Sequence, residues 1–198
     1  KFFPHTLALF HAIGIGLFLY LAKAPELSFL TILGSAVLVL IAEKDRKNAL
    51  VVFATILFFG YLIELIGVQT GYLFGTYEYE TAMGPLLFGT PIIIGATWYA
   101  VVAGSCSIVF NLKANILLKS LLAGTLAVAM DILIEQVAVG YGLWQWEGGQ
   151  IPLFNYICWF VFGTAFSAIY FKLTINPNRT ARYLYWIWLA FFAVLAIF

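Results

Sequence analysis

Charged residues are scarce in this chain of 198 residues: Asp, Glu, Lys and Arg together make up 10% of it, whereas 64% is hydrophobic. A soluble domain carries far more charge on its surface, so the composition excludes an ordinary soluble protein. The net charge of +1 also leaves no basic surface of the kind that binds nucleic acid. The chain is therefore expected to be an integral membrane protein with the lipid bilayer as its solvent.

Metal ligands and reactive side chains are also few. His5 and His11 both lie in the first apolar run, so the histidine clusters of membrane desaturases are absent and no spacing indicates a metal. Cys106 and Cys158 are expected near opposite ends of their helices, too far apart for a disulfide. Every lysine lies in a predicted loop or at a helix end, which excludes a retinal Schiff base. No glycine loop followed by lysine indicates nucleotide binding, so no cofactor is expected.

Long apolar runs recur seven times, and each has about the length needed to cross the hydrocarbon core. Their continuous apolarity favours helices over the alternating pattern of a membrane barrel. With no internal repeat or soluble appendage, residues 1–198 are expected to form a single transmembrane domain. The sequence predicts an all-α bundle of seven transmembrane helices, at about residues 2–22, 27–42, 48–67, 86–110, 116–139, 153–172 and 181–198.

The first of these runs has some features of a signal peptide, because Ala22-Lys23-Ala24 imitates a cleavage site. Its apolar part is longer than the usual core of 7–15 residues, so we expect a retained helix. Nine of the ten Lys and Arg residues, all except Lys23, fall at the start of the chain or in the second, fourth and sixth connections. By the positive-inside rule, the N-terminus is predicted inside and the C-terminus outside.

Three carboxylates interrupt the apolar runs: Glu64, Asp131 and Glu135. In the predicted topology all three occupy the outer half of the membrane, where no Lys or Arg lies at a similar depth. Asp131 and Glu135 are four residues apart and share a helix face. A buried charge is costly, and two neighbouring acids resist double ionisation, so Asp131 is expected to be a neutral carboxylic acid. Interface snorkelling by Glu64, or structural hydrogen bonding by Asp131 and Glu135, would be the purely structural interpretation.

Aromatic and small residues surround these acids. Trp98, Trp159 and Asn155 are expected near the outer ends of their helices, and Gly124 and Ala127 continue the face of Asp131, where small residues permit close helix packing. The two long outer loops, 68–85 and 140–152, are rich in Gly, Tyr and Trp. An interfacial aromatic belt explains such loops, but they are also suited to cover a site, with Tyr77, Trp144 and Trp146 as candidates for substrate contact.

Several segments together resemble the membrane carotenoid hydratase family, which includes carotenoid 1,2-hydratases and bisanhydrobacterioruberin hydratases. The resemblance covers residues 60–165 and is carried by five segments: ELIGVQTG through FGTYEY (64–79), LFGTP (87–91) leading to Trp98, Met130-Asp131 with Glu135, GLWQW (142–146), and IPLFNY (151–156) with Trp159-Phe160. One departure is Gln136, where many members have proline, and it is expected to straighten the helix locally. The resemblance also places the chain in a prokaryotic cytoplasmic membrane.

The resemblance implies that the chain adds water to the terminal double bond of an acyclic carotenoid, without a redox cofactor. Protonation gives a tertiary carbocation, which water captures. This chemistry needs a neutral acid, aromatic faces near the cation and a second carboxylate to orient water. We therefore assign Asp131 as the proton donor. Glu135 and Glu64 are expected to position the water molecule, and Asn155 to hold it. Trp98 and Trp159 are expected to flank the carbocation.

Two other functions fit the same residues. A membrane carotenoid cyclase would use the same protonation but capture the cation with an internal double bond. A proton-coupled transporter of a small or lipidic substrate also uses intramembrane acids, although the missing inverted repeat counts against it. A membrane scaffold without chemistry is the least specific alternative. The particular carotenoid, the number of ends that react and the oligomeric state are left open.

Overall fold

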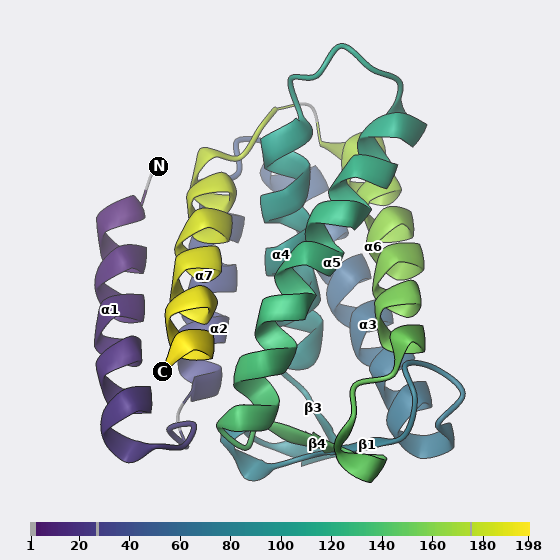
Figure 1. Cartoon of the computed structure of the whole chain (residues 1–198). Coiled ribbons are helices and arrows are strands. Elements are labelled where there is room, and N and C mark those ends of the chain that lie inside the picture. The colour runs from purple at the N-terminus through teal and green to yellow at the C-terminus, as the bar shows by residue number, and fades with distance from the viewer. Residues whose placement is uncertain (1–2, 27, 175) are drawn as a thin grey trace.

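The computed structural model describes residues 3–26, 28–174 and 176–198, and within these ranges the chain forms seven α-helices and two small β-sheets (Figure 1). The predicted helix positions 2 and 27 lie outside the described residues. The helices are α1 (Pro4–Leu21), α2 (Ser28–Ala42), α3 (Arg46–Thr70), α4 (Ile94–Val109), α5 (Ile116–Gly140), α6 (Leu153–Leu173) and α7 (Arg179–Ile197). The strands are β1 (Tyr77–Tyr79), β2 (Leu86–Leu87), β3 (Thr90–Pro91) and β4 (Trp144–Trp146), and short 3-10 helices span Thr81–Met83 and Glu147–Gly149.

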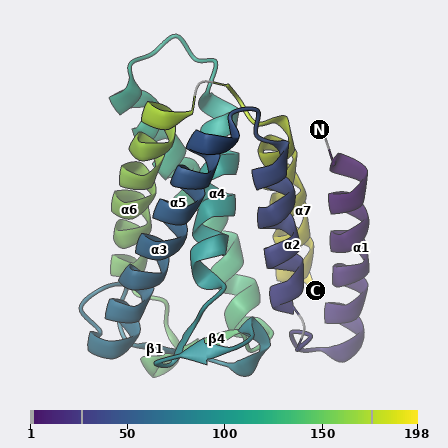
Figure 2. The same cartoon turned by 180° about the vertical axis from the view of Figure 1, so that it is seen from behind.

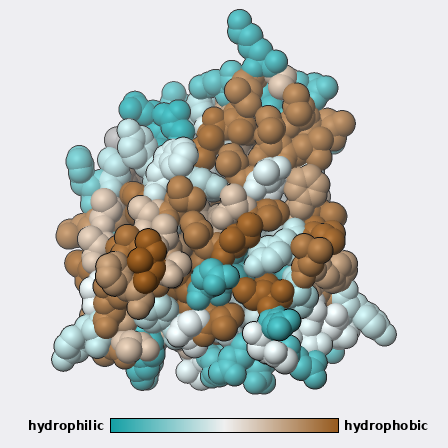
Figure 3. Space-filling view, viewed as in Figure 1, coloured by the Kyte–Doolittle hydropathy of each residue, from teal (hydrophilic) through white to brown (hydrophobic). Residues whose placement is uncertain are grey.

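Five helices among the described residues are long and apolar enough to cross a membrane: α1, α3, α5, α6 and α7. The other two, α2 and α4, are apolar but only 15 and 16 residues long. The predicted helical membrane protein is thus confirmed, whereas the seven crossings and the orientation of the termini stay predictions. In Figure 3, hydrophobic side chains cover the middle of one face and hydrophilic ones gather toward its upper and lower edges, as expected for a lipid-facing surface.

The predicted helix at 86–110 is wrong over its first eight residues, because β2 and β3 form a hairpin there and α4 begins only at Ile94. Phe88 and Gly89 have φ angles of 51° and 74°, which turn the chain between the two strands. Two successive residues with positive φ are typical of a tight hairpin turn and are incompatible with a right-handed helix. Pro91 therefore lies in a strand and does not start the helix.

The long loops are also more ordered than predicted, since β1 and β4 pair as antiparallel strands and join the α3–α4 connection to the α5–α6 connection. The two small sheets are thus an addition to the all-helical fold. α3 ends at Thr70, three residues later than predicted, where Gly71 adopts a left-handed conformation with φ of 67°. α5 runs unbroken through Gln136.

Helix α4 lies at the centre of the bundle, and almost all of its residues are buried (Figures 1 and 2). Gly95 allows α3 to approach closely, because a Cβ at this position would clash with the backbone of Leu57. Gly124 similarly lies against the α6 backbone near Phe160 and Thr164, and a Cβ on Gly163 would lie 3.2 Å from the Ala127 Cβ. The small-residue stripe predicted on α5 is therefore the contact face with α6.

The two ends of the bundle differ in chemistry. The N-termini of α3, α5 and α7 lie at one end, where the side chains of Asp45, Asn115 and Asn178 accept hydrogen bonds from the first turns of these helices. The connections at this end and the helix ends beside them carry eight of the ten basic residues. The opposite end holds β1 and β4 (Figures 1 and 2). Glu64, Asp131 and Glu135 lie toward this second end, away from most of the basic residues.

Candidate active site

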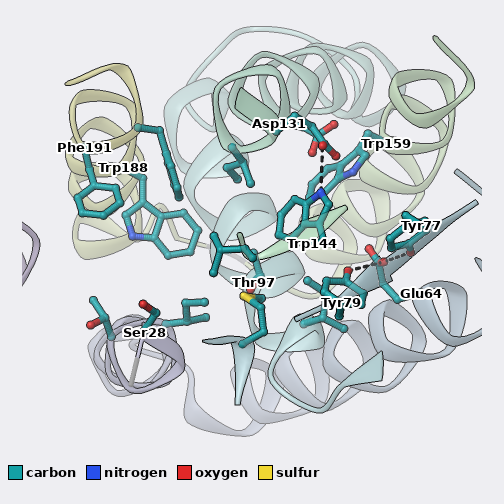
Figure 4. Close-up of a pocket in the computed structure, with 18 of the residues that line it drawn as sticks. Ser28, Glu64, Tyr77, Tyr79, Thr97, Asp131, Trp144, Trp159, Trp188 and Phe191 are labelled. Atoms are coloured by element: carbon teal, nitrogen blue, oxygen red, sulfur yellow. Dashed lines mark hydrogen bonds between the residues drawn. The ribbon is translucent and has the colours of Figure 1, made fainter. Parts of the chain in front are cut away.

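A cavity with an empty volume of about 960 Å³, including the open space at its mouth, brings the three predicted acids together (Figure 4). Glu64 from α3 and Asp131 and Glu135 from α5 line it, and their exposed fractions are 3%, 0% and 2%. A largely apolar cavity with a few converging polar groups is typical of small-molecule sites. The wall around the acids is completed by Phe74, Tyr77, Tyr79, Thr97, Trp144, Trp146, Asn155 and Trp159.

The β1–β4 ribbon supplies four of these side chains. Tyr77 pairs with Trp146, and Tyr79 pairs with Trp144. Alternate residues of a strand point to the same face, so both tyrosines and both tryptophans face the cavity. Glu78 and Gln145, which pair between them, are exposed on the other face.

Glu64 receives three hydrogen bonds. The hydroxyls of Tyr77 and Tyr79 donate to its Oε2 atom over 2.5 Å and 2.9 Å, and the Trp98 indole donates to Oε1 over 2.9 Å. Burial, and after it the charge of Glu64, raises the pKa of both tyrosines well above its ordinary value. The two hydroxyls therefore keep their protons and remain donors at neutral pH.

Glu135 also receives three hydrogen bonds. Trp144 and Trp146 donate their indole N–H groups to its Oε2 atom over 3.0 Å and 2.8 Å. Asn155 Nδ2 donates to Oε1 over 3.2 Å. The same nitrogen lies 2.9 Å from Asp131 Oδ2, so Asn155 bridges the two acids on α5. The predicted proximity of Asp131, Glu135 and Asn155 is thus present in the structure.

Asp131 differs from the other two acids. Its Oδ2 atom accepts the Asn155 hydrogen bond, but within the described part of the chain its buried Oδ1 atom has no hydrogen-bond partner. Buried polar atoms are almost always paired, so an unpartnered oxygen in a residue that lines a cavity marks a position where a ligand or water can bind. Thr97 Oγ1 on α4 is the second such atom in a residue that lines this cavity, again judged against the described residues alone.

The two predicted tryptophans occupy different layers. Trp159 lines the cavity, whereas Trp98 is fully buried and lies behind it, off the cavity wall. Their rings stack with centroids 3.8 Å apart and planes inclined by 17°. Trp98 therefore contacts Glu64 and Trp159, and direct contact with a ligand in this cavity falls to Trp159 alone of the pair.

Sequence reasoning missed several residues of the site. Tyr79 was noted only as a loop aromatic, although its alternation with Tyr77 in Tyr-Glu-Tyr is a strand signal. Thr97 carries no sequence signal of its own. His11 on α1 and Trp188 and Phe191 on α7 also line the cavity. Figure 4 shows Trp188 and Phe191 at some distance from Glu64 and Asp131. They come from the two ends of the sequence, which no local pattern relates to each other.

Metal ligands do not gather here: the described residues contain no group of three or more His, Cys, Asp or Glu side chains able to hold a metal ion. Cys106 and Cys158 are free and buried. Cys158 Sγ accepts a hydrogen bond from the Phe74 backbone N–H over 3.5 Å, which ties the α3–α4 connection to α6. The polar side chains that line the site near the acids are carboxylates, an amide, a hydroxyl and aromatic donors.

Comparison with known proteins identifies a family and a relative. Residues 27–198, which include every helix except α1, match the family model described as carotenoid biosynthesis protein. Bisanhydrobacterioruberin hydratase of Haloarcula japonica is 32% identical over 128 residues, which is 61% of this chain and 43% of that protein. The chain thus spans less than half the length of this curated relative. No solved structure matches. Because the family match covers most of the chain, the protein belongs to the carotenoid biosynthesis protein family.

Proposed function

We propose that this protein is a carotenoid 1,2-hydratase, a hydro-lyase that adds water to the terminal double bond of an acyclic carotenoid end group by acid catalysis. Family membership and the hydratase name of the Haloarcula japonica relative support a carotenoid-modifying activity. Hydration as the particular reaction is our inference from the three carboxylates. Neither a metal nor a redox cofactor enters the proposed steps.

The observation that carries this proposal is the unequal distribution of hydrogen-bond donors among the acids. Glu64 and Glu135 each receive three donors, an arrangement that stabilises ionised carboxylates. Asp131, which lines the cavity, receives a single donor on Oδ2, and its Oδ1 atom has no partner among the described residues. With an anionic Glu135 one helical turn away, Asp131 is the acid that holds a proton. Oδ1 is then the atom that delivers it.

The first step transfers this proton to carbon. The π electrons of the 1,2 double bond form a C–H bond at C2 with the Asp131 proton, and C1 becomes a tertiary carbocation. Asp131 is left as an anion beside the cation, and Asn155 Nδ2 stabilises the new charge through Oδ2. The Trp159 ring on the cavity wall supplies a π face for the cation.

The second step completes the addition. A lone pair of water forms the C–O bond at C1, and the resulting oxonium loses a proton to Glu135. That proton returns to Asp131 through water in the cavity, so the net change is one added water molecule and a tertiary alcohol. Glu64, held by Tyr77 and Tyr79, gives the water a second acceptor and completes the acidic wall.

The test is a change of pigment mass. The chain is expressed in a bacterial host that accumulates lycopene, and extracts are analysed by liquid chromatography with mass spectrometry. We expect products heavier by one water that lose it again on acid dehydration. An isomer of unchanged mass would instead establish a cyclase. Unchanged pigment with this and other acyclic carotenoids, together with gradient-driven uptake into proteoliposomes, would replace the hydratase with a transporter.

A further inference from the structure

The cavity has a second arm that the hydration chemistry does not use. From the acids it passes Thr97 and reaches a region between α1, α2 and α7 (Figure 4). The wall of this arm is formed by His11, Gly14 and Phe18 of α1, Ser28, Thr31 and Ile32 of α2, and Trp188, Phe191 and Phe192 of α7. Helix α1, which lies outside the residues matched by the family model, thus forms part of the cavity wall.

The described residues of this arm carry no formal charge. His11 is held in a neutral form, because its Nδ1 atom hydrogen-bonds the Leu7 carbonyl over 2.7 Å and its Nε2 atom accepts the Trp188 indole N–H over 2.7 Å. Phe191 packs edge-on against both His11 and Phe18, with centroids 5.5 Å and 5.6 Å away. A wall of aromatic faces and neutral side chains favours an uncharged ligand with a large apolar surface.

The two ends of the cavity differ in their access to the surroundings. The acids and Asn155 are buried at one end, whereas Gly14, Ser28, Thr31 and Ile32 are partly exposed at the other. The surface beside these partly exposed residues is apolar: Ile13 and Leu17 of α1 and Leu33 of α2 are 54%, 45% and 42% exposed. An opening at these residues, between α1 and α2, would therefore face lipid and not water.

We propose that this arm, termed the chain arm, is the entrance and binding site for the unreacted polyene chain of the substrate. The identity of the chain rests on the proposed function. An acyclic carotenoid dissolved in the bilayer enters end-first between α1 and α2, and its end group advances past Thr97 to Asp131. The rest of the conjugated chain then lies along the aromatic wall of Phe18, Trp188 and Phe191.

Gly14 of α1 and Ile32 of α2 both line the chain arm. A Cβ on Gly14 would lie 3.2 Å from the Phe191 ring, so a larger side chain there would fill space beside this ring or displace it. Ile32 contributes to the wall from α2. The next residue, Leu33, is exposed to lipid and is absent from the cavity wall, which makes it a matched control site for the same substitution.

The test measures binding separately from catalysis. Lycopene is achiral, so a circular dichroism band in its visible absorption reports a chain held in a chiral site. The detergent-solubilised wild type, Ile32→Trp, Gly14→Leu and the control Leu33→Trp are titrated with lycopene. We expect the band with wild type and Leu33→Trp, and an apparent affinity reduced by about tenfold or more in Ile32→Trp and Gly14→Leu, because overpacking blocks the arm.

The outcomes separate this proposal from the proposed function. Equal lycopene affinity in all four proteins, or equal hydration rates in wild type and both blocked variants, would overturn the chain arm even if hydration occurs. A band that only the blocked variants lose, without any hydrated product, would support the arm and overturn the hydratase. Absence of both the band and the product in wild type, with lycopene and with other acyclic carotenoids, would overturn both proposals. The blocked variants are compared only as monodisperse protein that elutes like wild type.

Discussion

Trp98 stacks on Trp159 with ring centroids 3.8 Å apart, and only Trp159 faces the cavity. The inner ring donates its N–H to Glu64. The pair therefore connects an acid on α3 to the aromatic face that the proposed carbocation meets. Replacing either ring should affect the reaction, but for different reasons.

Trp159→Leu should lower the hydration rate by about 2- to 30-fold, because a cation–π contact contributes roughly 0.5–2 kcal/mol. Trp159→Phe, which keeps a smaller π face, is the control and should lose less. Trp98→Phe keeps the stack but removes the indole donor to Glu64. Initial rates in detergent with lycopene compare the three variants. Equal rates for Trp159→Leu and wild type would remove this ring from the mechanism.

Asp131→Asn should reduce hydration by about 10²- to 10⁴-fold, the usual contribution of a general acid. The amide cannot deliver the proton, yet its size is nearly unchanged, so lycopene binding should persist. Glu135→Gln should keep slow protonation and show a smaller loss. Rates and lycopene affinity are measured together for both variants. If Asp131→Asn retains near-normal hydration, the proton donor must be another group.

Glu43→Gln should change the pH dependence of stability. Glu43 follows α2, and its Oε1 atom accepts hydrogen bonds from Asn178 Nδ2 over 2.8 Å and from the Tyr170 hydroxyl over 3.0 Å. Burial raises the pKa of this carboxyl above its ordinary value of 4.5, while the two donors act in the opposite direction. The folded state thus binds the proton more tightly than the unfolded chain.

The stability that Glu43 contributes is therefore complete below about pH 4.5 and is lost as the pH rises through the folded-state pKa. Glutamine keeps the acceptor oxygen and carries no charge. At pH 8 we expect Glu43→Gln to unfold about 2–4 °C above wild type, which corresponds to roughly 1 kcal/mol for a chain of this size. The difference should vanish near pH 4. The exposed Glu78→Gln serves as control, and a lower unfolding temperature of Glu43→Gln at pH 8 would contradict the prediction.

Gly95→Ala should destabilise the bundle by about 1–3 kcal/mol, since the new methyl group would clash with the Leu57 backbone. Separation of α3 from α4 would also move Glu64 away from Trp98, so activity should fall with stability. Gly16→Ala on α1 is the control: its Cβ would meet nothing within 4 Å, and alanine favours helix by up to about 1 kcal/mol. Thermal unfolding in detergent distinguishes the two variants.

The helices were predictable because a segment that crosses lipid must be apolar over its full length, and the residue count alone then limits its ends. The meeting of Asp131, Glu135 and Asn155 was also predictable, because helical periodicity places the first two on one face. The hairpin before α4 was not, since Leu86, Leu87 and Ile92–Ile94 are as apolar as a helix. Only the positive φ angles at Phe88 and Gly89 separate the two structures.

The β1–β4 ribbon and the chain arm could not be predicted from the sequence, for different reasons. Tyr-Glu-Tyr and Trp-Gln-Trp each alternate as strands do, but two runs of three residues are too short to stand out from interfacial aromatics. His11 and Trp188 are 177 residues apart in sequence and meet only when α1 packs on α7. Long-range packing of this kind leaves no periodic signal.

Pairing of β1 with β4 has a consequence for how these loops can change. A slip of one residue turns every side chain of a strand to the opposite face. Such a slip in either strand would withdraw two aromatic donors at once, from Glu64 if β1 moved and from Glu135 if β4 moved. Insertions or deletions in residues 71–76 or 141–143 are therefore tolerated only when the same strand residues still face the cavity. Sequences that evolve from this one can change the length of these loops, but they must keep the alternation that turns both tyrosines and both tryptophans toward the cavity.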